Sequence, residues 1–215
     1  MLMRILRIGV PSAGENLSYD ISQLVILIFV NLLGDVEVTT RSYGYMFSWL
    51  CCIFTMSVGS SLRIMVGYLI GAGKHDEATK VIKKSLIASM IISVGTTLII
   101  LTFSDAFYGI FTENPEIFVL GKKILYAEIA LEVGRTINVI MVSSLQAAGD
   151  IKFPVTLGII SNWSVAVVLS YVFGIVLGWG LVGVWVAMAT DECLRGVIYL
   201  FRFRSGVWRK KNIMA

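Results

Sequence analysis

Long apolar segments separated by short polar connections run along the whole chain. A transmembrane helix needs roughly 20 mostly apolar residues to cross the hydrocarbon core of a bilayer. Six segments meet that length, at about 5–33, 42–70, 81–103, 122–148, 153–177 and 180–203. The third and fifth are the most apolar, because residues 85–103 and 153–177 contain no charged side chain. The pattern predicts an all-α integral membrane protein in which six transmembrane helices form one bundle. The membrane lobe would cover residues 1–204, followed by a basic cytoplasmic tail over 205–215.

The first segment carries a polar stripe on an otherwise apolar helix. Its polar residues recur at helical spacing on one face: Ser12, Glu15, Asn16, Tyr19, Ser22 and Gln23. A charge at bilayer depth costs about 3 kcal/mol even on lenient scales, so such residues usually face a protein interior or an aqueous cavity. Glu15 has no basic partner within its own helix, and Pro11, one turn earlier, loosens that helix. We therefore predict that Glu15 binds a cation or a cationic substrate, with Asp20 as a second candidate acid.

The fourth segment also carries a polar face. It comprises Glu128, Glu132, Arg135, Thr136, Ser143 and Gln146, with Asn138 near its edge. Glu132 and Arg135 are three residues apart, which is a spacing for an ion pair within a helix. Two interpretations are open. Either the pair neutralises itself and ties helices together, or it belongs to a site for substrate or ions.

Two further groups have mainly structural interpretations. One compact group near the inner end of the sixth helix is interpreted as a salt-bridge network: Asp191, Glu192 and Arg195. Three aromatic residues near the start of the second helix either anchor it at the membrane interface or contact an aromatic substrate: Tyr43, Tyr45 and Trp49. Anchoring is the more common role of such residues.

Composition and charge agree with a membrane location. The chain has 215 residues, of which 57% are hydrophobic and only 15% charged, with a mean hydropathy of +0.83. This balance excludes an ordinary soluble domain. Basic residues gather at the ends of the apolar segments: Arg4, Arg7, Lys74, Lys80, Lys83, Lys84, Lys152, Arg202, Arg204, Arg209, Lys210 and Lys211. Because cytoplasmic loops carry an excess of lysine and arginine, we predict a multi-pass plasma (inner) membrane protein with both termini in the cytoplasm and no nucleic-acid partner.

Residue types required for catalysis are scarce. His75 is the only histidine, and it lies in a predicted cytoplasmic loop. Cys51, Cys52 and Cys193 fall within predicted helices, at spacings that suggest neither a metal site nor a disulfide framework. The glycine-rich sequence before Lys74 lacks the spacing of a phosphate-binding loop. The sequence therefore predicts a protein that is not an enzyme, with no catalytic residue and no cofactor other than a coupling ion.

Three runs of sequence, in this order, resemble the multidrug and toxic compound extrusion (MATE) family. They are GVPSAGENLSYDISQ at 9–23, LEVGRTINVIMVSSLQAAGDIKFPV at 131–155 and GLVGVWVAMATDECLRGVIYLFRFRSGVW at 180–208. Members of that family typically have twelve helices in two lobes, related by a pseudo-two-fold axis along the membrane normal. They export drugs, organic cations or metabolites in exchange for sodium ions or protons. This chain resembles the C-terminal lobe, so the resemblance implies the missing N-terminal lobe, or a second copy of the chain, as partner.

The resemblance also implies roles for individual residues. Glu15 matches an acid in the first helix of the C-terminal lobe that is often implicated in binding cations or substrate, so it is the candidate sodium site. Some relatives carry an acid in the fourth helix of this lobe, where this chain has Glu132 and Arg135. The residues that we predict to bind substrate or cations lie on these two helices: Glu15, Asn16, Tyr19, Gln23, Glu132, Arg135 and Asn138.

The function that follows is export of small organic molecules, such as drugs or organic cations, by a cation-coupled antiporter. The lobes would rock about a central site in the membrane and expose it to each side in turn. Two alternatives are open. A lipid-linked oligosaccharide flippase of a related superfamily would have a wider, more basic cavity, whereas few basic residues apart from Arg135 are expected at depth. A non-transporting membrane subunit would co-purify with another chain and show no ion dependence.

Overall fold

Six long helices make up most of the chain between residues 2 and 210. The computed structural model describes these residues, and the side chains of residues 13–209. In chain order the long helices are α1 (Leu2–Asn31), α2 (Asp35–Gly71), α3 (His75–Thr102), α5 (Pro115–Ala147), a continuous helix over 152–176 and α8 (Gly180–Arg204). Two short elements are α4 (Ser104–Gly109) and the 3₁₀ helix η3 (Val207–Lys210), and no β-strand occurs in residues 2–210.

The predicted all-α bundle of six helices is therefore confirmed. α2, α3 and α5 begin at residues 35, 75 and 115, earlier than the predicted 42, 81 and 122. Each of these helices starts with a polar first turn that an apolar pattern does not include. α1 continues through Pro11 without a break, although the side chains of Pro11 and Ser12 lie outside the described ones.

The helix over residues 152–176 changes its winding along its length. α6 (Lys152–Ser161) leads into the π-helical segment η1 (Asn162–Val167), then α7 (Val168–Tyr171) and a second π-helical segment, η2 (Val172–Val176). π-Helical turns are rare and occur frequently at functional sites. At the start of η1, Nδ2 of Asn162 donates a hydrogen bond to Oγ of Ser22 on α1, at 2.6 Å. The change of winding thus coincides with a polar contact between two helices.

Three helices within the described residues are long and apolar enough to cross a membrane: α2, α3 and the helix 152–176. α1, α5 and α8 do not meet this criterion, because they carry charged and polar side chains. In α5 and α8 the acidic side chains of the central turns are buried inside the bundle: Glu128, Glu132, Asp191 and Glu192. The charges that lower the apparent hydropathy of these helices are therefore turned away from the bundle surface.

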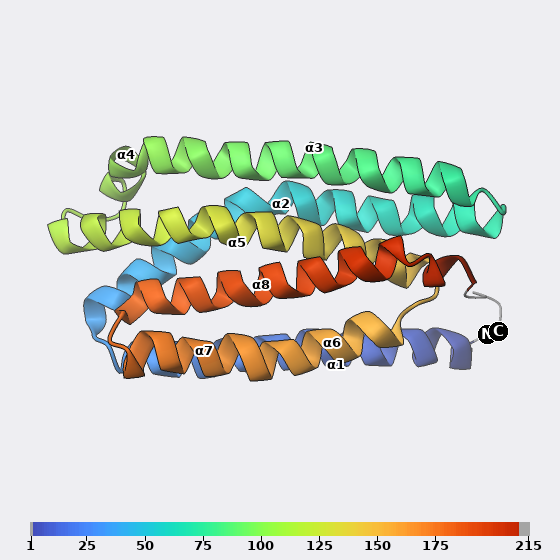
Figure 1. The fold of residues 1–215 in the computed structure, drawn as a ribbon. Helices are drawn as coiled ribbons and strands as arrows, with labels where there is room; N and C mark the ends of the chain where they lie inside the picture. Colours follow the sequence, from blue (N-terminus) through green and yellow to red (C-terminus); the bar gives the residue numbers. More distant parts are fainter. Residues whose placement is uncertain (1, 211–215) are drawn as a thin grey trace.

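Tight turns join α2 to α3 and α5 to α6. Gly73 and Gly149 have φ angles of 75° and 85°, which glycine adopts without steric cost, and each ends its helix in the preferred way. Figure 1 shows that these two turns, the start of α1 and the end of α8 lie at one end of the bundle. The even number of long helices places the start of α1 and the end of α8 together, and Lys74, Lys80, Lys152 and Arg204 lie at this end of the bundle.

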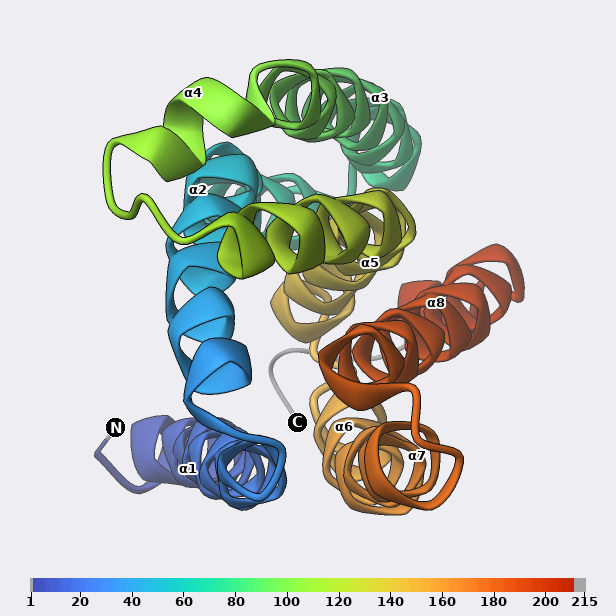
Figure 2. The same cartoon turned by 90° about the vertical axis from the view of Figure 1, so that its left-hand side faces the viewer.

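Viewed end-on, the helices form two groups joined by α8 (Figure 2). α2, α3 and α5 pack together, α1 lies beside the α6–α7 helix, and α8 lies between α5 and α6–α7. α5 and α8 cross closely, since a Cβ atom on Gly134 would lie 2.6 Å from the backbone nitrogen of Cys193. A Cβ on Gly196 would lie 3.2 Å from the carbonyl oxygen of Gly134. Small residues permit such an approach, which brings the polar residues of both helices into contact.

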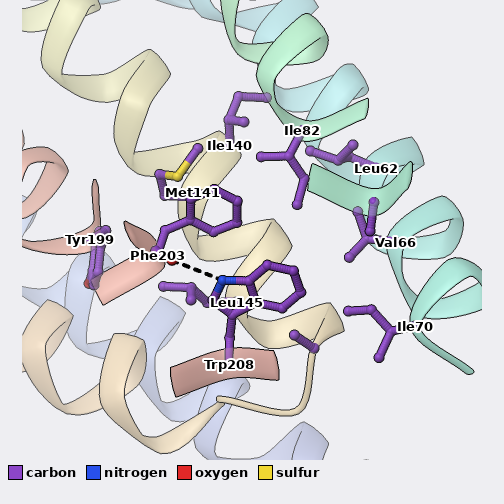
Figure 3. Close-up of a cluster of buried hydrophobic side chains, with 12 residues drawn as sticks. Leu62, Val66, Ile70, Ile82, Ile140, Met141, Leu145, Tyr199, Phe203 and Trp208 are labelled. Atoms are coloured by element: carbon purple, nitrogen blue, oxygen red, sulfur yellow. Dashed lines mark hydrogen bonds between the residues drawn. The ribbon is translucent and has the colours of Figure 1, made fainter. Parts of the chain in front are cut away.

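A hydrophobic cluster packs α2, α3, α5 and α8 together near the end that carries the turns (Figure 3). Trp208 of η3 is part of it: the side chain is 2% exposed, and Nε1 donates a hydrogen bond to the carbonyl oxygen of Phe203 at 2.9 Å. Arg209 forms an ion pair with Asp76 at 3.2 Å. The described start of the predicted basic tail therefore packs on the lobe, while residues 211–215 lie outside the described part.

Candidate functional site

A cavity of about 270 Å³ lies between the two groups of helices. α1, α6 and η1 line one side of it, and α2, α5 and α8 line the other. Glu192, the central residue of α8, and Glu15, near the middle of α1, both line it. The cavity therefore extends from the level of these two helix midpoints toward the end that carries the α2–α3 turn, where Arg63 of α2 and Ser143 of α5 also line it.

Glu15 faces this cavity from α1. A Cβ atom on Gly158 of α6 would lie 2.6 Å from Oε1 of Glu15, so a larger residue here would require the carboxylate to shift. Glu15 makes no hydrogen bond or ion pair with any side chain in residues 13–209, and Arg195 and Arg63 are the basic groups that act on it electrostatically. Its carboxylate is thus half-buried and available to a ligand.

The other residues of the α1 stripe separate into two sets. Asn16 and Tyr19 line the cavity with Glu15. Gln23 does not line it, but its Oε1 accepts a hydrogen bond from the hydroxyl of Tyr45, which does, at 3.4 Å. Asp20, the second candidate acid, is exposed on another face of α1 and is not part of the cavity wall.

Glu128, Glu132 and Arg135 of α5 form a second group, together with Ser48, Ser93 and Trp185, that we call the closed network. Arg135 forms ion pairs with Glu132 and, at 3.6 Å, with Glu128. Both carboxylates are at most 1% exposed. Arg135 also lines the cavity, but Glu132 lies behind it and takes no part in the wall. Glu132 and Arg135 therefore form an ion pair, but only Arg135 is part of the cavity wall.

Hydrogen bonds from three other helices complete the closed network. Nε1 of Trp185 on α8 donates to Glu128 at 2.7 Å, and the hydroxyl of Ser48 on α2 donates to the same carboxylate. Nη1 of Arg135 donates to Oγ of Ser48 at 2.9 Å. The hydroxyl of Ser93 on α3 donates to Glu132. Such a set satisfies buried charges and joins four helices.

The group around Arg195 differs from the sequence-based interpretation. Arg195 pairs with Asp191 at 2.6 Å and with Glu192 at 3.0 Å, so the predicted salt bridges are present. Their predicted position near a helix end is wrong, because Glu192 is the midpoint of α8 and is 7% exposed. Nδ2 of Asn138, a predicted site residue, donates to Glu192 at 2.5 Å. The group lines the cavity, and its place in the middle of the predicted sixth segment was a signal available in the sequence.

Two arginines besides Arg135 line the cavity: Arg195 beside Glu192, which is buried, and Arg63 of α2, which is exposed. Ser57, Ser60 and Ser61 precede Arg63 in the second apolar segment, and this polar run was a visible signal. The cavity therefore contains both acidic and basic side chains. A flippase of lipid-linked sugars is instead expected to have a wider, more basic cavity.

The three aromatic residues of α2 also have different positions. Tyr45 and Trp49 line the cavity, as contact with a substrate would require. Tyr43 instead stacks on Phe111 with ring centroids 5.2 Å apart, near the opposite end of the bundle from the tight turns. Of the seven predicted site residues, the structure brings five around one cavity: Glu15, Asn16, Tyr19, Arg135 and Asn138.

Oxygen atoms in this cavity could hold a hard cation. Besides the carboxylate of Glu15, Oδ1 of Asn162 is buried and accepts no hydrogen bond from the side chains described. Within those residues, no group of three or more His, Cys, Asp or Glu side chains could hold a metal ion. A carboxylate in a cavity of mixed charge can bind a proton, a monovalent cation or a cationic organic group, each of which neutralises it.

The chain is similar to known proteins over nearly its whole length. A family model described as MatE matches residues 11–172. The uncharacterized transporter YisQ of Bacillus subtilis (strain 168) is 37% identical over 212 residues, which cover 99% of this chain and 47% of that protein. The probable multidrug resistance protein NorM of Thermotoga maritima is 27% identical, covering 98% of this chain and 45% of that protein.

A solved structure of MATE in the straight conformation has the same fold. It superposes with a TM-score of 0.87 at 18% identity, covering 98% of this chain and 48% of that one. The chain thus spans about half the length of the curated relatives that it matches. Relatives named as multidrug resistance proteins do not favour the flippase alternative.

Proposed function

The chain belongs to the MatE family, and from that premise we propose that it is the C-terminal lobe of a cation-coupled antiporter that exports drugs or organic cations. One observation carries this proposal: the carboxylate of Glu15, near the middle of α1, lines a cavity and has no partner in residues 13–209. A carboxylate removed from water is stabilised by a proton or a bound cation. Glu15 would therefore be occupied in turn by the coupling ion, sodium or a proton, and by the cationic group of a substrate.

Alternating access supplies the mechanism for this exchange. The lobe would rock against a second lobe, so that the cavity opens to one side of the membrane and then to the other. Binding of the coupling ion to Glu15 would displace the substrate on the outer side, and loss of the ion on the inner side would regenerate the carboxylate. The relatives of this chain are transporters and not enzymes. The exchange therefore needs only that the coupling ion and the substrate compete for Glu15, without a chemical reaction.

A second lobe is needed because the cavity has walls on only part of its circumference. Asn16 and Trp49 line it yet are exposed at the surface of the lobe. Polar residues exposed at this depth are costly in lipid, and a partner would cover them. The chain spans about half of its relatives, so the partner is the missing N-terminal lobe or a second copy of this chain.

The proposal is tested by Glu15→Gln in a complete transporter reconstituted in liposomes. We expect normal insertion but loss of ion-driven export, by tenfold or more, because the amide keeps the shape of the side chain and cannot exchange a charge. Export would be measured as a function of the sodium and proton gradients at equal protein abundance.

Two comparison variants sharpen this test. Glu77→Gln, on an exposed ion pair with Lys74 at the end of the bundle, should leave export unchanged. Asp20→Asn removes the other acid of α1. Unchanged coupling in Glu15→Gln, together with its loss in Asp20→Asn, would assign the coupling carboxylate to Asp20 and contradict the proposal.

We also propose that the protein lies in the plasma (inner) membrane with both termini in the cytoplasm. Support comes from the basic residues at the end that carries the α2–α3 and α5–α6 turns, and from the acidic residues of the connection around α4. Single cysteines at Lys80 and at Asn114, in a background without native cysteines, should react with an impermeant reagent from opposite sides. Labelling of both from the same side would contradict this topology.

A further inference from the structure

An open groove of about 240 Å³ lies on the surface of the bundle between α2 and α3, and it shares no lining residue with the cavity around Glu15. The two helices lie side by side from the turn that joins them (Figure 1). Its walls combine apolar side chains with three serines: Ser57 and Ser61 of α2 and Ser85 of α3. The groove thus presents hydroxyl groups within an otherwise apolar surface.

The groove lies where α3 enters the hydrocarbon core. The uncharged stretch of α3 from Ser85 to Thr102 spans about 27 Å at 1.5 Å per residue, close to the roughly 30 Å thickness of the core. Ser85 is therefore at the boundary between headgroups and acyl chains. On α2, Tyr68 is 77% exposed three residues before the helix ends, and tyrosine is enriched at this boundary.

Lysines flank the groove on α3. Lys80 and Lys84 are four residues apart and therefore share one face of the helix, and both are exposed. Lys84 is also three residues after Val81, which lines the groove. Neither lysine forms a hydrogen bond or ion pair with the described side chains. Glu77, four residues before Val81, is paired with Lys74 at 3.1 Å and so repels an anion at the groove only weakly.

The groove continues into exposed apolar surface on the membrane side. Ile92 lies seven residues after Ser85 on α3, and Phe54 lies seven residues before Ser61 on α2. Seven residues are about two helical turns, so each extends the wall of the groove on the same face, and both are exposed. From the boundary inwards the surface therefore offers a cation, hydroxyl groups and then apolar side chains. A phospholipid has a charged headgroup above its acyl chains and matches this order.

We propose that this groove binds an anionic phospholipid, with the phosphate at Lys84 and Ser85 and one acyl chain along Phe54 and Ile92. The inference goes beyond the proposed function, because it concerns the lipid-facing surface and not the cavity. A lysine ammonium attracts an anionic headgroup, and the Ser85 hydroxyl, which has no hydrogen-bond partner in residues 13–209, can donate to the phosphate. Zwitterionic lipids carry the same phosphate, but their own cation weakens its attraction to Lys84.

Native mass spectrometry of a complete transporter that contains this lobe tests the proposal. The protein would be titrated in detergent micelles with phosphatidylglycerol and with phosphatidylcholine of the same acyl chains, and dissociation constants would be derived from the lipid-bound fractions. We expect phosphatidylglycerol to bind about fivefold more tightly, since one basic residue near an anionic headgroup contributes about that factor.

Two substitutions at exposed positions separate charge from shape. Lys84→Gln should abolish the preference for phosphatidylglycerol. Lys83→Gln is the matched control: it changes the net charge equally at an exposed position one residue away, but on another face of α3, and should retain the preference. Ser61→Leu fills the groove without changing charge and should weaken the binding of both lipids several-fold.

Three results would overturn the proposal. Equal losses in Lys84→Gln and Lys83→Gln would show that the basic end of the bundle attracts anions diffusely. Competition by glycerol phosphate at the concentrations at which the lipid binds would show an anion site that does not use the acyl chain. If Ser61→Leu alters the oligomeric state of the transporter and leaves lipid binding unchanged, then the groove is an interface with another protein chain.

Discussion

The closed network around Arg135 and the cavity around Glu15 lie next to each other and contain the same kinds of side chain. In the closed network, Glu128 and Glu132 share one arginine and receive hydrogen bonds from two serines and a tryptophan. In the cavity, Glu15 and Arg63 have no such partners in residues 13–209. Charge at depth is therefore not sufficient to identify a binding site. The informative feature is a charge that the lobe itself does not satisfy.

Glycine contributes differently to the two regions. At Gly134 an added Cβ would meet the backbone of α8, so this glycine permits two helices to approach and brings buried charges together. At Gly158 an added Cβ would meet the carboxylate of Glu15, so this glycine makes room for one side chain. The first glycine permits a close crossing of two helices, and the second leaves space for a carboxylate beside the cavity.

Removal of Arg135 is the strongest test of the closed network. We expect Arg135→Met to lower the free energy of unfolding by about 3–5 kcal/mol, because it leaves two buried carboxylates without their cation. The measurement is an unfolding titration with SDS in mixed micelles, with Arg204→Gln as a surface control. A double variant with Glu132→Gln should recover part of the loss. A loss below about 1 kcal/mol would show that the network is not satisfied internally as described.

The two glycines provide a matched pair with a smaller expected effect. Gly134→Ala should destabilise the lobe by about 1–3 kcal/mol, because the backbone of α8 must move. Gly158→Ala should change stability by less than about 1 kcal/mol, since only the end of a side chain must shift and alanine favours the helix. It should nevertheless reduce coupled export in a complete transporter several-fold, by displacing Glu15.

A third glycine serves as the control for this pair. Gly95 of α3 has no atom within 4 Å of an added Cβ, so Gly95→Ala should affect neither stability nor export adversely. Equal destabilisation by Gly134→Ala and Gly158→Ala would mean that Glu15 is as rigidly packed as the α5–α8 crossing. In that case the contrast between the two regions would not hold.

The α1 part of the site could be predicted from sequence because its polar face is a minority on an apolar helix. Glu15, Asn16 and Tyr19 recur at helical spacing, and that periodicity alone places them together. The six helices were predictable for the same reason, since length and hydropathy are local properties. The helix starts were less accurate, because polar first turns carry no apolar signal.

The sequence alone does not show which helices pack against each other. Arg63 and Glu15 are far apart in the chain, and their common cavity depends on how α1, α2 and α6 pack. Gly158 gives no sign in the sequence that a carboxylate lies against it. The depth of Glu192 was available from its central place in the sixth segment, but a salt-bridge spacing on one helix is equally compatible with a helix end.

The smallest expected effect concerns the stability of Glu15→Gln, and it tests the comparison most directly. A half-buried carboxylate without a partner contributes a desolvation cost, so its removal should leave the free energy of unfolding within about 0.5 kcal/mol or raise it slightly. Glu132→Gln, on the same scale, should lower it, because Arg135 and Ser93 lose a charged partner. Both variants would be measured in the same SDS titration, at a pH where carboxylates are ionised in water. If Glu15→Gln destabilises the lobe as much as Glu132→Gln does, then Glu15 is satisfied within the lobe. The cavity would in that case be a second closed network rather than a place for substrate or ions.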